Sequence, residues 1–238
     1  MLVRVIRWGV VLCCVAMGLG VRPAAATAPP AAPVLVLGGF AADQAKVETL
    51  RAWLGARGYA AYSMLLPGDP TGTAAIADSA RAVADRVAEI RRETGAARVD
   101  LVGHSMGGLA QRHYVKFLGG REQVGTYIDY GTPEHGTSLA VACAWAAGCR
   151  DLVPGSEFLT LLNAEPAVPP GLPAYHFFST DAGEEREPLP GAMNAAVQTF
   201  CPGRAVSHAD EPIDAAMQQL IAAALRGGPL ATDCPPQS

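Results

Sequence analysis

Val99-Asp-Leu-Val-Gly-His-Ser-Met-Gly-Gly-Leu109 is the stretch that decides the fold of this 238-residue chain. Its apolar beginning, 99–102, is typical of a buried strand, and a helical pattern over 106–118 follows. Between them, 103–107 matches the pattern G-x-S-x-G, which predicts a nucleophile elbow, a strained turn that lifts Ser105 above the sheet. Its glycines leave room where strand and helix approach closely, and the helix N-terminus faces any negative charge formed at the serine. The alternative is an ordinary Gly-rich turn with a solvent-facing serine.

The N-terminal segment has the composition of an export signal. Arg4 and Arg7 make its start positive, and the apolar run 8–19 is too short to span a membrane comfortably. Small residues at 24–26 favour cleavage after Ala26, so we expect a secreted protein with a single domain over residues 27–238. Cleavage after Ala28 is disfavoured by the proline that follows it, and an uncleaved N-terminal anchor is the alternative.

The composition of the mature chain limits its partners. Removing 26 of 238 residues leaves 212, enough for one domain with a full core. The net charge falls from −4 to −7, because the signal takes three arginines and no acidic residue with it. This acidic balance argues against binding to nucleic acid or to an anionic membrane surface.

Four cysteines remain after the signal is removed, and they allow three pairings. An even number in an exported chain predicts two disulfides. The short separation of Cys143 and Cys149 favours a local bridge, which leaves Cys201 and Cys234 to tie the C-terminal tail to the body. Metal binding by these cysteines is poorly supported, because no pair has C-x-x-C spacing and no histidine adjoins one. We expect no cofactor and no metal.

Strand-like and helix-like segments alternate through the chain. The predicted strands are 34–37, 59–66, 99–102, 124–130, 174–179 and 205–207. The predicted helices are 43–57, 71–93, 106–118 and 210–225, with a short helical excursion over 138–173. This alternation predicts an α/β fold with a mostly parallel sheet of about six strands and helices on both faces. Ligands of such sheets bind beyond the carboxyl ends of the strands, where five candidate residues fall: Gly39, Ser105, Gly131, Asp181 and His208.

A serine hydroxyl is a weak nucleophile and needs a base. His208 follows the last predicted strand and precedes the last predicted helix, so a returning loop can bring it to Ser105. Its alternative role is to cap the helix that begins near Asp210. We assign the other histidines to structural or pocket-lining positions: His104, His113, His135 and His176.

The base needs a carboxylate that holds its tautomer and stabilises its charged form. Asp181 lies just after the predicted strand 174–179, and the order Ser105, Asp181, His208 is the order expected for this kind of sheet. The alternative for Asp181 is a turn aspartate before Ala182-Gly183. Four other carboxylates remain rivals: Glu134, Glu184, Glu185 and Asp210.

An oxyanion formed at the serine needs two backbone donors. One is the N–H of Met106, directly after the nucleophile. The other is the N–H of Phe40, in the loop after the first strand, where Gly38-Gly39 lets the backbone approach a substrate.

These motifs together resemble the secreted bacterial lipases of the α/β-hydrolase superfamily. The likeness is strongest to the small actinobacterial and Bacillus-type triacylglycerol lipases and covers roughly residues 33–226. It rests on 34–40, 103–108, 131–137, Asp181 and His208. It implies hydrolysis of carboxylic esters of lipids through an acyl-enzyme, with little or no lid. We also expect a monomer that makes transient contact with a lipid surface. One departure is that Gly38-Gly39 stands where the family usually has His-Gly.

Two other functions remain open. The same acyl-enzyme could transfer its acyl group to an alcohol of the cell envelope. An exported binding module on a hydrolase scaffold is the non-enzymatic alternative, against which the complete serine, aspartate and histidine set argues. The apolar segment 152–172 is either an acyl-chain surface or ordinary core.

Overall fold

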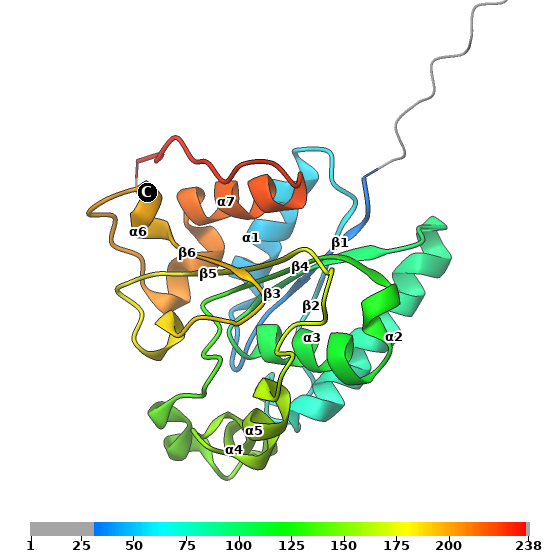
Figure 1. Cartoon of the computed structure of the whole chain (residues 1–238), viewed down its shortest axis with the longest axis vertical. Helices are drawn as coiled ribbons and strands as arrows, with labels where there is room; N and C mark the ends of the chain where they lie inside the picture. The colour runs from blue at the N-terminus through cyan, green and yellow to red at the C-terminus, as the bar shows by residue number, and fades with distance from the viewer. Residues whose placement is uncertain (1–30, 237–238) are drawn as a thin grey trace, which may run out of the picture. The chain divides into compact units, whose positions relative to one another are not determined.

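The computed structural model describes residues 31–236, so the predicted signal segment, 1–26, lies outside the described residues. Six strands of the described chain form one sheet in the order β2-β1-β3-β4-β5-β6, and all neighbouring strands are parallel. These strands are β1 (Val34–Leu37), β2 (Ala61–Met64), β3 (Val99–His104), β4 (Val124–Tyr130), β5 (Ala174–Phe178) and β6 (Met193–Ala196). The predicted α/β fold is confirmed (Figure 1).

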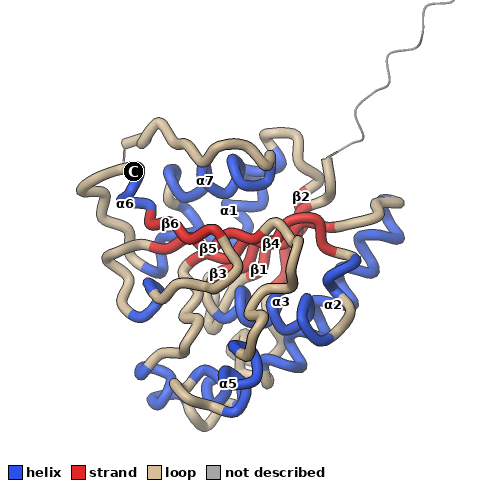
Figure 2. Tube along the Cα trace, viewed as in Figure 1, coloured by secondary structure: helices blue, strands red, loops and turns tan. Residues whose placement is uncertain are grey.

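Helices cover both faces of the sheet, as Figure 2 shows. Helices α1 (Gln44–Gly55) and α7 (Ala215–Leu225) pack on one face, and α2 (Ile76–Thr94) and α3 (Met106–Phe117) pack on the other. In β1, Val34 and Val36 belong to the hydrophobic core on the side of α1 and α7, whereas Leu35 and Leu37 belong to the core on the side of α2 and α3. This alternation explains why the strand is apolar throughout, because each of its two faces is covered.

The predicted helical excursion is present between β4 and β5. It consists of the 3₁₀ segment η2 (Ser138–Cys143), α4 (Ala147–Leu152) and α5 (Glu157–Asn163), and the predicted disulfide Cys143–Cys149 crosslinks its first part. The excursion also fixes the start of α2, because Asp151 Oδ2 accepts the Ile76 N–H at 2.8 Å. The prediction that this helix begins at residue 71 is wrong, since Gly72 and Ala74 N–H both donate to Pro67 O in a turn.

The last strand and the last helix also differ from prediction. The sixth strand is β6, not 205–207. Residues 205–207 lie in a loop whose Val206 N–H donates to Asp181 Oδ2 at 3.1 Å. The closing helix begins only at 215, capped by Asp214, and the 3₁₀ segment η4 (His208–Ile213) precedes it. The remaining elements are η1 (Gly120–Glu122), η3 (Glu184–Arg186) and α6 (Val197–Phe200).

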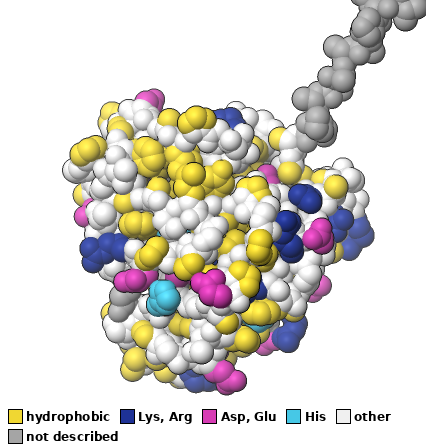
Figure 3. Space-filling model, in the orientation of Figure 1, with side chains coloured by type: hydrophobic (Ala, Val, Ile, Leu, Met, Phe, Trp, Pro, Cys, Tyr) yellow, Lys and Arg dark blue, Asp and Glu magenta, His cyan; other side chains and the backbone are white. Residues whose placement is uncertain are grey.

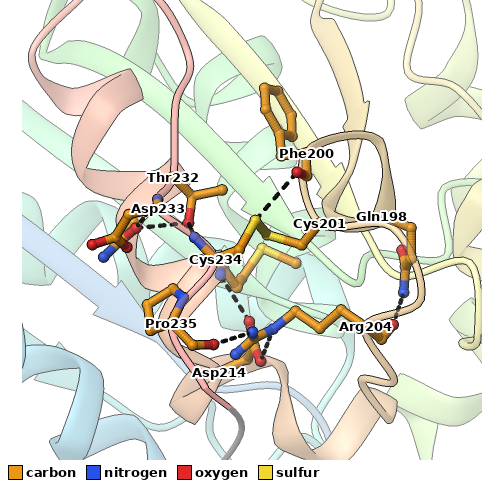
Figure 4. The surroundings of a disulfide bond; sticks show 11 residues. Gln198, Phe200, Cys201, Arg204, Asp214, Thr232, Asp233, Cys234 and Pro235 are labelled. Carbon is orange, nitrogen blue, oxygen red and sulfur yellow. Dashed lines mark hydrogen bonds and ion pairs between the residues drawn. A yellow bond between two sulfur atoms is a disulfide. The ribbon is translucent and has the colours of Figure 1, made fainter.

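A second disulfide, Cys201–Cys234, ties the C-terminal segment to the loop that leads to His208. Arg204 stands beside it (Figure 4), and its Nε lies 2.7 Å from Asp214 Oδ2 while its Nη1 donates to Pro235 O. Both predicted cysteine pairings are therefore confirmed. Among residues 31–236, no helix is long and apolar enough to cross a membrane.

Candidate active site

Ser105 occupies the predicted turn between β3 and α3, with φ 55° and ψ −129°. A side chain at positive φ is strained, and such strain collects at functional sites. The turn also requires the glycines around it. A Cβ on Gly39 would lie 2.7 Å from Ser105 Cβ, and one on Gly107 would lie 2.6 Å from Gly38 O. The loop after β1 therefore runs directly against the serine.

The structure brings the predicted base to the predicted nucleophile. His208 Nε2 lies 3.1 Å from Ser105 Oγ, which is hydrogen-bond distance. The two residues are held by different elements, since Ser105 precedes α3 and His208 opens η4.

The structure does not bring the predicted carboxylate, Asp181, to His208. The chain turns immediately after β5, where Ala182 N–H donates to Ser179 O, and this turn leaves Asp181 exposed. Its carboxylate instead accepts the N–H of Val206 in the loop before His208. Asp181 is thus a turn residue, the alternative that its sequence context left open.

Two other carboxylates reach the second nitrogen of His208. Glu185, on η3, places Oε1 2.8 Å from His208 Nδ1, and Glu211 places Oε2 3.5 Å from it. Glu185 was one of the rivals to Asp181, whereas Glu211 was not foreseen. A signal for Glu211 exists in the sequence: it is three residues after His208, and side chains at that spacing in a 3₁₀ segment lie on the same side.

The other predicted rivals are engaged elsewhere. Asp210 pairs with Lys46 at 2.8 Å, and Glu134 pairs with Arg112 inside the protein. The side chain of Glu184 lies outside the described part of the structure.

The carboxylates set the charge of the base. Burial by itself would lower the pKa of His208, but Glu185 and then Glu211 outweigh it and raise this pKa to about 9. The charged imidazolium is therefore favoured in this site.

The predicted oxyanion donors belong to the two segments next to the serine, the start of α3 and the loop after β1. Met106 is the first residue of α3, and the first N–H groups of a helix have no acceptor within it. Phe40 lines a cleft that also reaches Ser105 and His208. The loop that carries Phe40 is held against residues 71–72. Ala41 N–H donates to Thr71 O, and a Cβ on Gly72 would lie only 2.8 Å from Phe40 Cα.

Two clefts meet at Ser105 and His208. One, of about 170 Å³, runs along the start of α1 and includes Lys46 and Asp43. The other, of about 290 Å³, runs beneath the excursion, and Glu185 is also part of its lining. The uncharged residues that line it are Pro133, Thr137, Ser138, Leu139, Leu152 and Gly183.

Exposed apolar side chains adjoin the second cleft. Leu139 is 79% exposed, Val141 64% and Trp145 69%, and all three lie on or next to η2. On the face drawn in Figure 3, hydrophobic side chains form patches among uncharged atoms, and charged side chains are scattered singly or in small groups. An apolar rim beside the serine is suited to contact with an acyl chain.

A fully buried polar network lies behind the site. His176 Nδ1 pairs with Asp129, and His176 Nε2 lies 3.2 Å from the backbone oxygen of Glu185. Glu134 pairs with Arg112, whose positive charge balances the acidic groups. Burial opposes protonation of His176, but Asp129 raises its pKa to about 9. The predicted structural role of His176 agrees with these contacts.

The remaining predicted histidines take three different positions. His104 stacks on His208 with ring centroids 4.5 Å apart, His113 packs between Phe117 and Phe158, and His135 is exposed outside both clefts. Among residues 31–236, two clusters could offer three donors each to a metal ion: His104, His208 and Glu211, and Asp129, Glu134 and His176. In both clusters the donors already contact one another.

Solved structures share this fold. Aspergillus fumigatus lipase B aligns with a TM-score of 0.71 and 19% identity over 84% of this chain, which spans only 53% of the lipase. The mature Bacillus licheniformis lipase BlEst2 aligns with a TM-score of 0.56 and 17% identity over 74% of this chain and 87% of its own. An α/β-hydrolase enzyme from a lagoon-sediment metagenome aligns with a TM-score of 0.54 and 15% identity, covering 82% and 91% of the two chains. The chain therefore has the α/β-hydrolase fold.

A comparison with curated protein sequences finds no match. A family model described as palmitoyl protein thioesterase matches residues 33–168, more than half of the chain. The matched region includes the elbow at Ser105 and ends before Glu185 and His208. From this match, the chain belongs to the palmitoyl protein thioesterase family of α/β-hydrolases.

Proposed function

We propose that this protein is a serine hydrolase of carboxylic esters of lipids, a lipase or esterase that works through an acyl-enzyme. One observation carries the proposal: Ser105 sits at a strained turn with its Oγ 3.1 Å from His208 Nε2, while the other nitrogen of His208 lies 2.8 Å from Glu185. Nucleophile, base and carboxylate thus form one chain of contacts.

In the first half-reaction, Ser105 Oγ attacks the ester carbonyl carbon while its proton passes to His208 Nε2. The N–H groups of Phe40 and Met106 stabilise the oxyanion that forms. As the bond from carbon to the alcohol oxygen breaks, His208 returns the proton to that oxygen. The acyl group is then bonded to Ser105, and His208 is again neutral.

In the second half-reaction, water replaces the alcohol. His208 takes a proton from the water, whose oxygen attacks the acyl carbon, and then protonates Ser105 Oγ as the acid leaves. Glu185 stabilises the positive charge that His208 carries during both steps.

The two clefts divide the substrate between them. The acyl chain lies along the larger cleft, where Pro133, Leu139 and Leu152 offer apolar contact. The alcohol side faces the smaller cleft with Lys46 and Asp43. We infer that the exposed side chains of Leu139, Val141 and Trp145 touch a lipid surface transiently, as a secreted lipase of the small bacterial type would do.

A thioester is a second candidate substrate, because the family is described by its action on palmitoyl proteins. Thioesters and oxygen esters use the same acyl-enzyme, so the two activities differ only in the leaving group. Transfer of the acyl group to an alcohol is a third candidate reaction, because it uses the same acyl-enzyme. Export is inferred from the two disulfides, which persist in oxidising compartments.

The test compares the protein with Ser105→Ala. We expect a fluorophosphonate to label the unaltered protein at Ser105, and p-nitrophenyl esters of rising acyl length to be hydrolysed. In Ser105→Ala, labelling should vanish and turnover should fall by about 10⁴-fold or more while the circular dichroism spectrum stays the same. Comparable turnover in a folded Ser105→Ala protein would refute the mechanism. A palmitoyl thioester and added alcohols, assayed in parallel, rank the three acyl reactions.

A further inference from the structure

We propose that Glu211 is a second carboxylate of the catalytic histidine, sharing with Glu185 the orientation of the His208 ring and the stabilisation of its positive charge. This inference rests on the proposed function of Ser105 and His208, and it assigns Glu211 a positioning role rather than contact with the substrate.

Glu211 is held in place from three directions. Its side chain is fully buried, with 0% exposed. Ser179 N–H, just beyond β5, donates to Oε1 at 3.2 Å, and His104 Nε2, at the end of β3, lies 3.2 Å from Oε2. The same Oε2 lies 3.5 Å from His208 Nδ1. A carboxylate fixed in this way keeps its position relative to the His208 ring.

The fold leaves space for this carboxylate at one glycine. Gly131 ends β4 with φ 57°, and a Cβ there would lie 1.8 Å from Glu211 Oε2 and 3.1 Å from His208 Nδ1. No side chain can stand at 131 while Glu211 occupies its site. The absence of a Cβ at 131 is thus coupled directly to Glu211 and His208.

His104 leaves the charge of Glu211 available to His208. His104 Nε2 faces two oxygens, His208 O at 3.1 Å and Glu211 Oε2, so this nitrogen carries the hydrogen. Burial lowers the pKa of His104, which keeps its ring neutral. Although burial opposes ionisation of Glu211, the hydrogen bond from His104 and the nearby ring of His208 lower the pKa of Glu211, which favours its negatively charged form. The ring of His104 stacked on His208 is therefore an uncharged spacer.

Glu185 is held less firmly than Glu211. Its side chain is 12% exposed, and its Oε2 has no hydrogen-bond partner within the described residues. His208 Nδ1 approaches both carboxylates but forms no well-aligned hydrogen bond with either of them. The Nδ1–H group therefore lies between two negative charges. Other charged groups at this loop are bonded elsewhere: Lys46 pairs with Asp210, and the Asp181 carboxylate accepts the Val206 N–H.

The first experiment measures the pKa of His208 directly, without activity. The Ser105→Ala protein and its Ser105→Ala/Glu211→Gln counterpart are titrated by NMR with labelled histidine. We expect the pKa of His208 to fall by about one unit or more when Glu211 loses its charge, because an opposite charge this close shifts a pKa by that amount. An unchanged pKa would overturn the proposal, whatever the reaction of the enzyme proves to be.

The second experiment tests whether Glu185 and Glu211 both contribute to orienting His208 and stabilising its positive charge. Glu185→Gln and Glu211→Gln are each expected to lower kcat by about 10- to 100-fold, and the double variant by about 10⁴-fold, as when a triad carboxylate is absent. Rates are divided by the number of sites that a fluorophosphonate labels, so that misfolded protein does not count. Glu187→Gln, an exposed glutamate on the same loop as Glu185, is the matched control and should keep full activity.

Two outcomes of this second experiment count against sharing. If Glu185→Gln is already as inactive as the double variant, Glu211 contributes nothing to the charge on His208. If Glu211→Gln lowers only the number of labelled sites, its role is confined to folding. Activity that survives Ser105→Ala would instead remove the proposed function, and the NMR result would still stand.

Discussion

At the scale of single residues, the chemistry of the site depends on one line of contacts. Ser105 Oγ lies 3.1 Å from one nitrogen of His208, and the other nitrogen faces the carboxylates of Glu185 and Glu211 at 2.8 and 3.5 Å. Ser105 was predicted from the strand, turn and helix pattern around it, and His208 from its place before the last helix. The structure brings the two within 3.1 Å, although the strand predicted just before His208 is a loop. The carboxylate was misplaced, because the position of Glu185 depends on a turn of the loop after β5 that no local pattern specifies. To predict that Glu211 lies beside His208, one would have to know that residues 208–213 form a 3₁₀ segment.

The first residue-scale prediction separates the two candidate acids. Asp181→Asn should keep activity within about twofold, because an exposed turn carboxylate is usually only solvated. Glu185→Gln should lose about 10- to 100-fold, since Glu211 remains beside His208. Steady-state kcat on a p-nitrophenyl ester decides between them. Collapse of activity in Asp181→Asn with an unaffected Glu185→Gln would return the role to Asp181.

The second residue-scale prediction concerns pH. His208 acts as a base only when its ring is neutral, and the carboxylates raise its pKa to about 9. The fraction of active enzyme therefore grows as pH rises, and kcat/KM should climb until roughly pH 9 rather than level off near the ordinary value of about 6.5. Initial rates from pH 5 to 10, corrected for spontaneous ester hydrolysis, give the profile. In Glu185→Gln the rising limb should move to lower pH. If kcat/KM of the unaltered protein instead levelled off near pH 6.5, the carboxylates would not raise the pKa of His208.

At the scale of elements, the strands in the middle of the sheet were the easiest to predict. The bounds of β1 match the apolar run 34–37, because burial on two faces makes a strand apolar throughout, and the bounds of β4 match the predicted strand 124–130. The edge strand β6 was missed because its first residues are exposed and carry no such pattern. The start of α2 was also misplaced, since its N–H partner lies 75 residues away in sequence.

That distant partner supports a prediction about the stability of α2. Its flanking residue, Ala75, makes no side-chain cap, and Asp151 Oδ2 accepts the Ile76 N–H in its place. Asp151→Ala should therefore lower the free energy of unfolding by about 1 kcal/mol, the usual effect of losing a cap. Asp151→Asn, which retains an acceptor oxygen, is the control and should lose less. Urea unfolding followed by circular dichroism measures both, and equal midpoints for Asp151→Ala and the unaltered protein would exclude the capping role.

At the scale of the whole molecule, the parallel sheet gathers the site from the ends of several strands. Gly39 follows β1, Ser105 follows β3, Gly131 follows β4 and Glu185 follows β5, while His208 arrives on the loop after α6. The alternation of strands and helices was sufficient to predict this edge as the site. It was not sufficient to predict which carboxylate completes the site, because long loops are placed by tertiary contacts.

The two disulfides give the last prediction, which compares loops of different length. A disulfide restricts the unfolded chain more when the loop it closes is longer, so Cys201–Cys234, with a sequence separation of 33, should stabilise by about 4 kcal/mol. Cys143–Cys149, with a separation of 6, should stabilise by about 2 kcal/mol. Paired Cys→Ser variants at each bridge, compared by urea unfolding, test the order of the two losses.

Arg204 makes the expected difference between the bridges larger. It lies between the two sides of the longer loop, bonded to Asp214 and to Pro235 O, and the latter contact depends on the tail staying in place. Loss of Cys201–Cys234 should therefore also lower activity, because the released loop leads to His208. Thiol counting in denatured, unreduced protein checks that both bridges form. A larger loss of stability from the shorter bridge would show that loop length does not govern how these disulfides stabilise the fold.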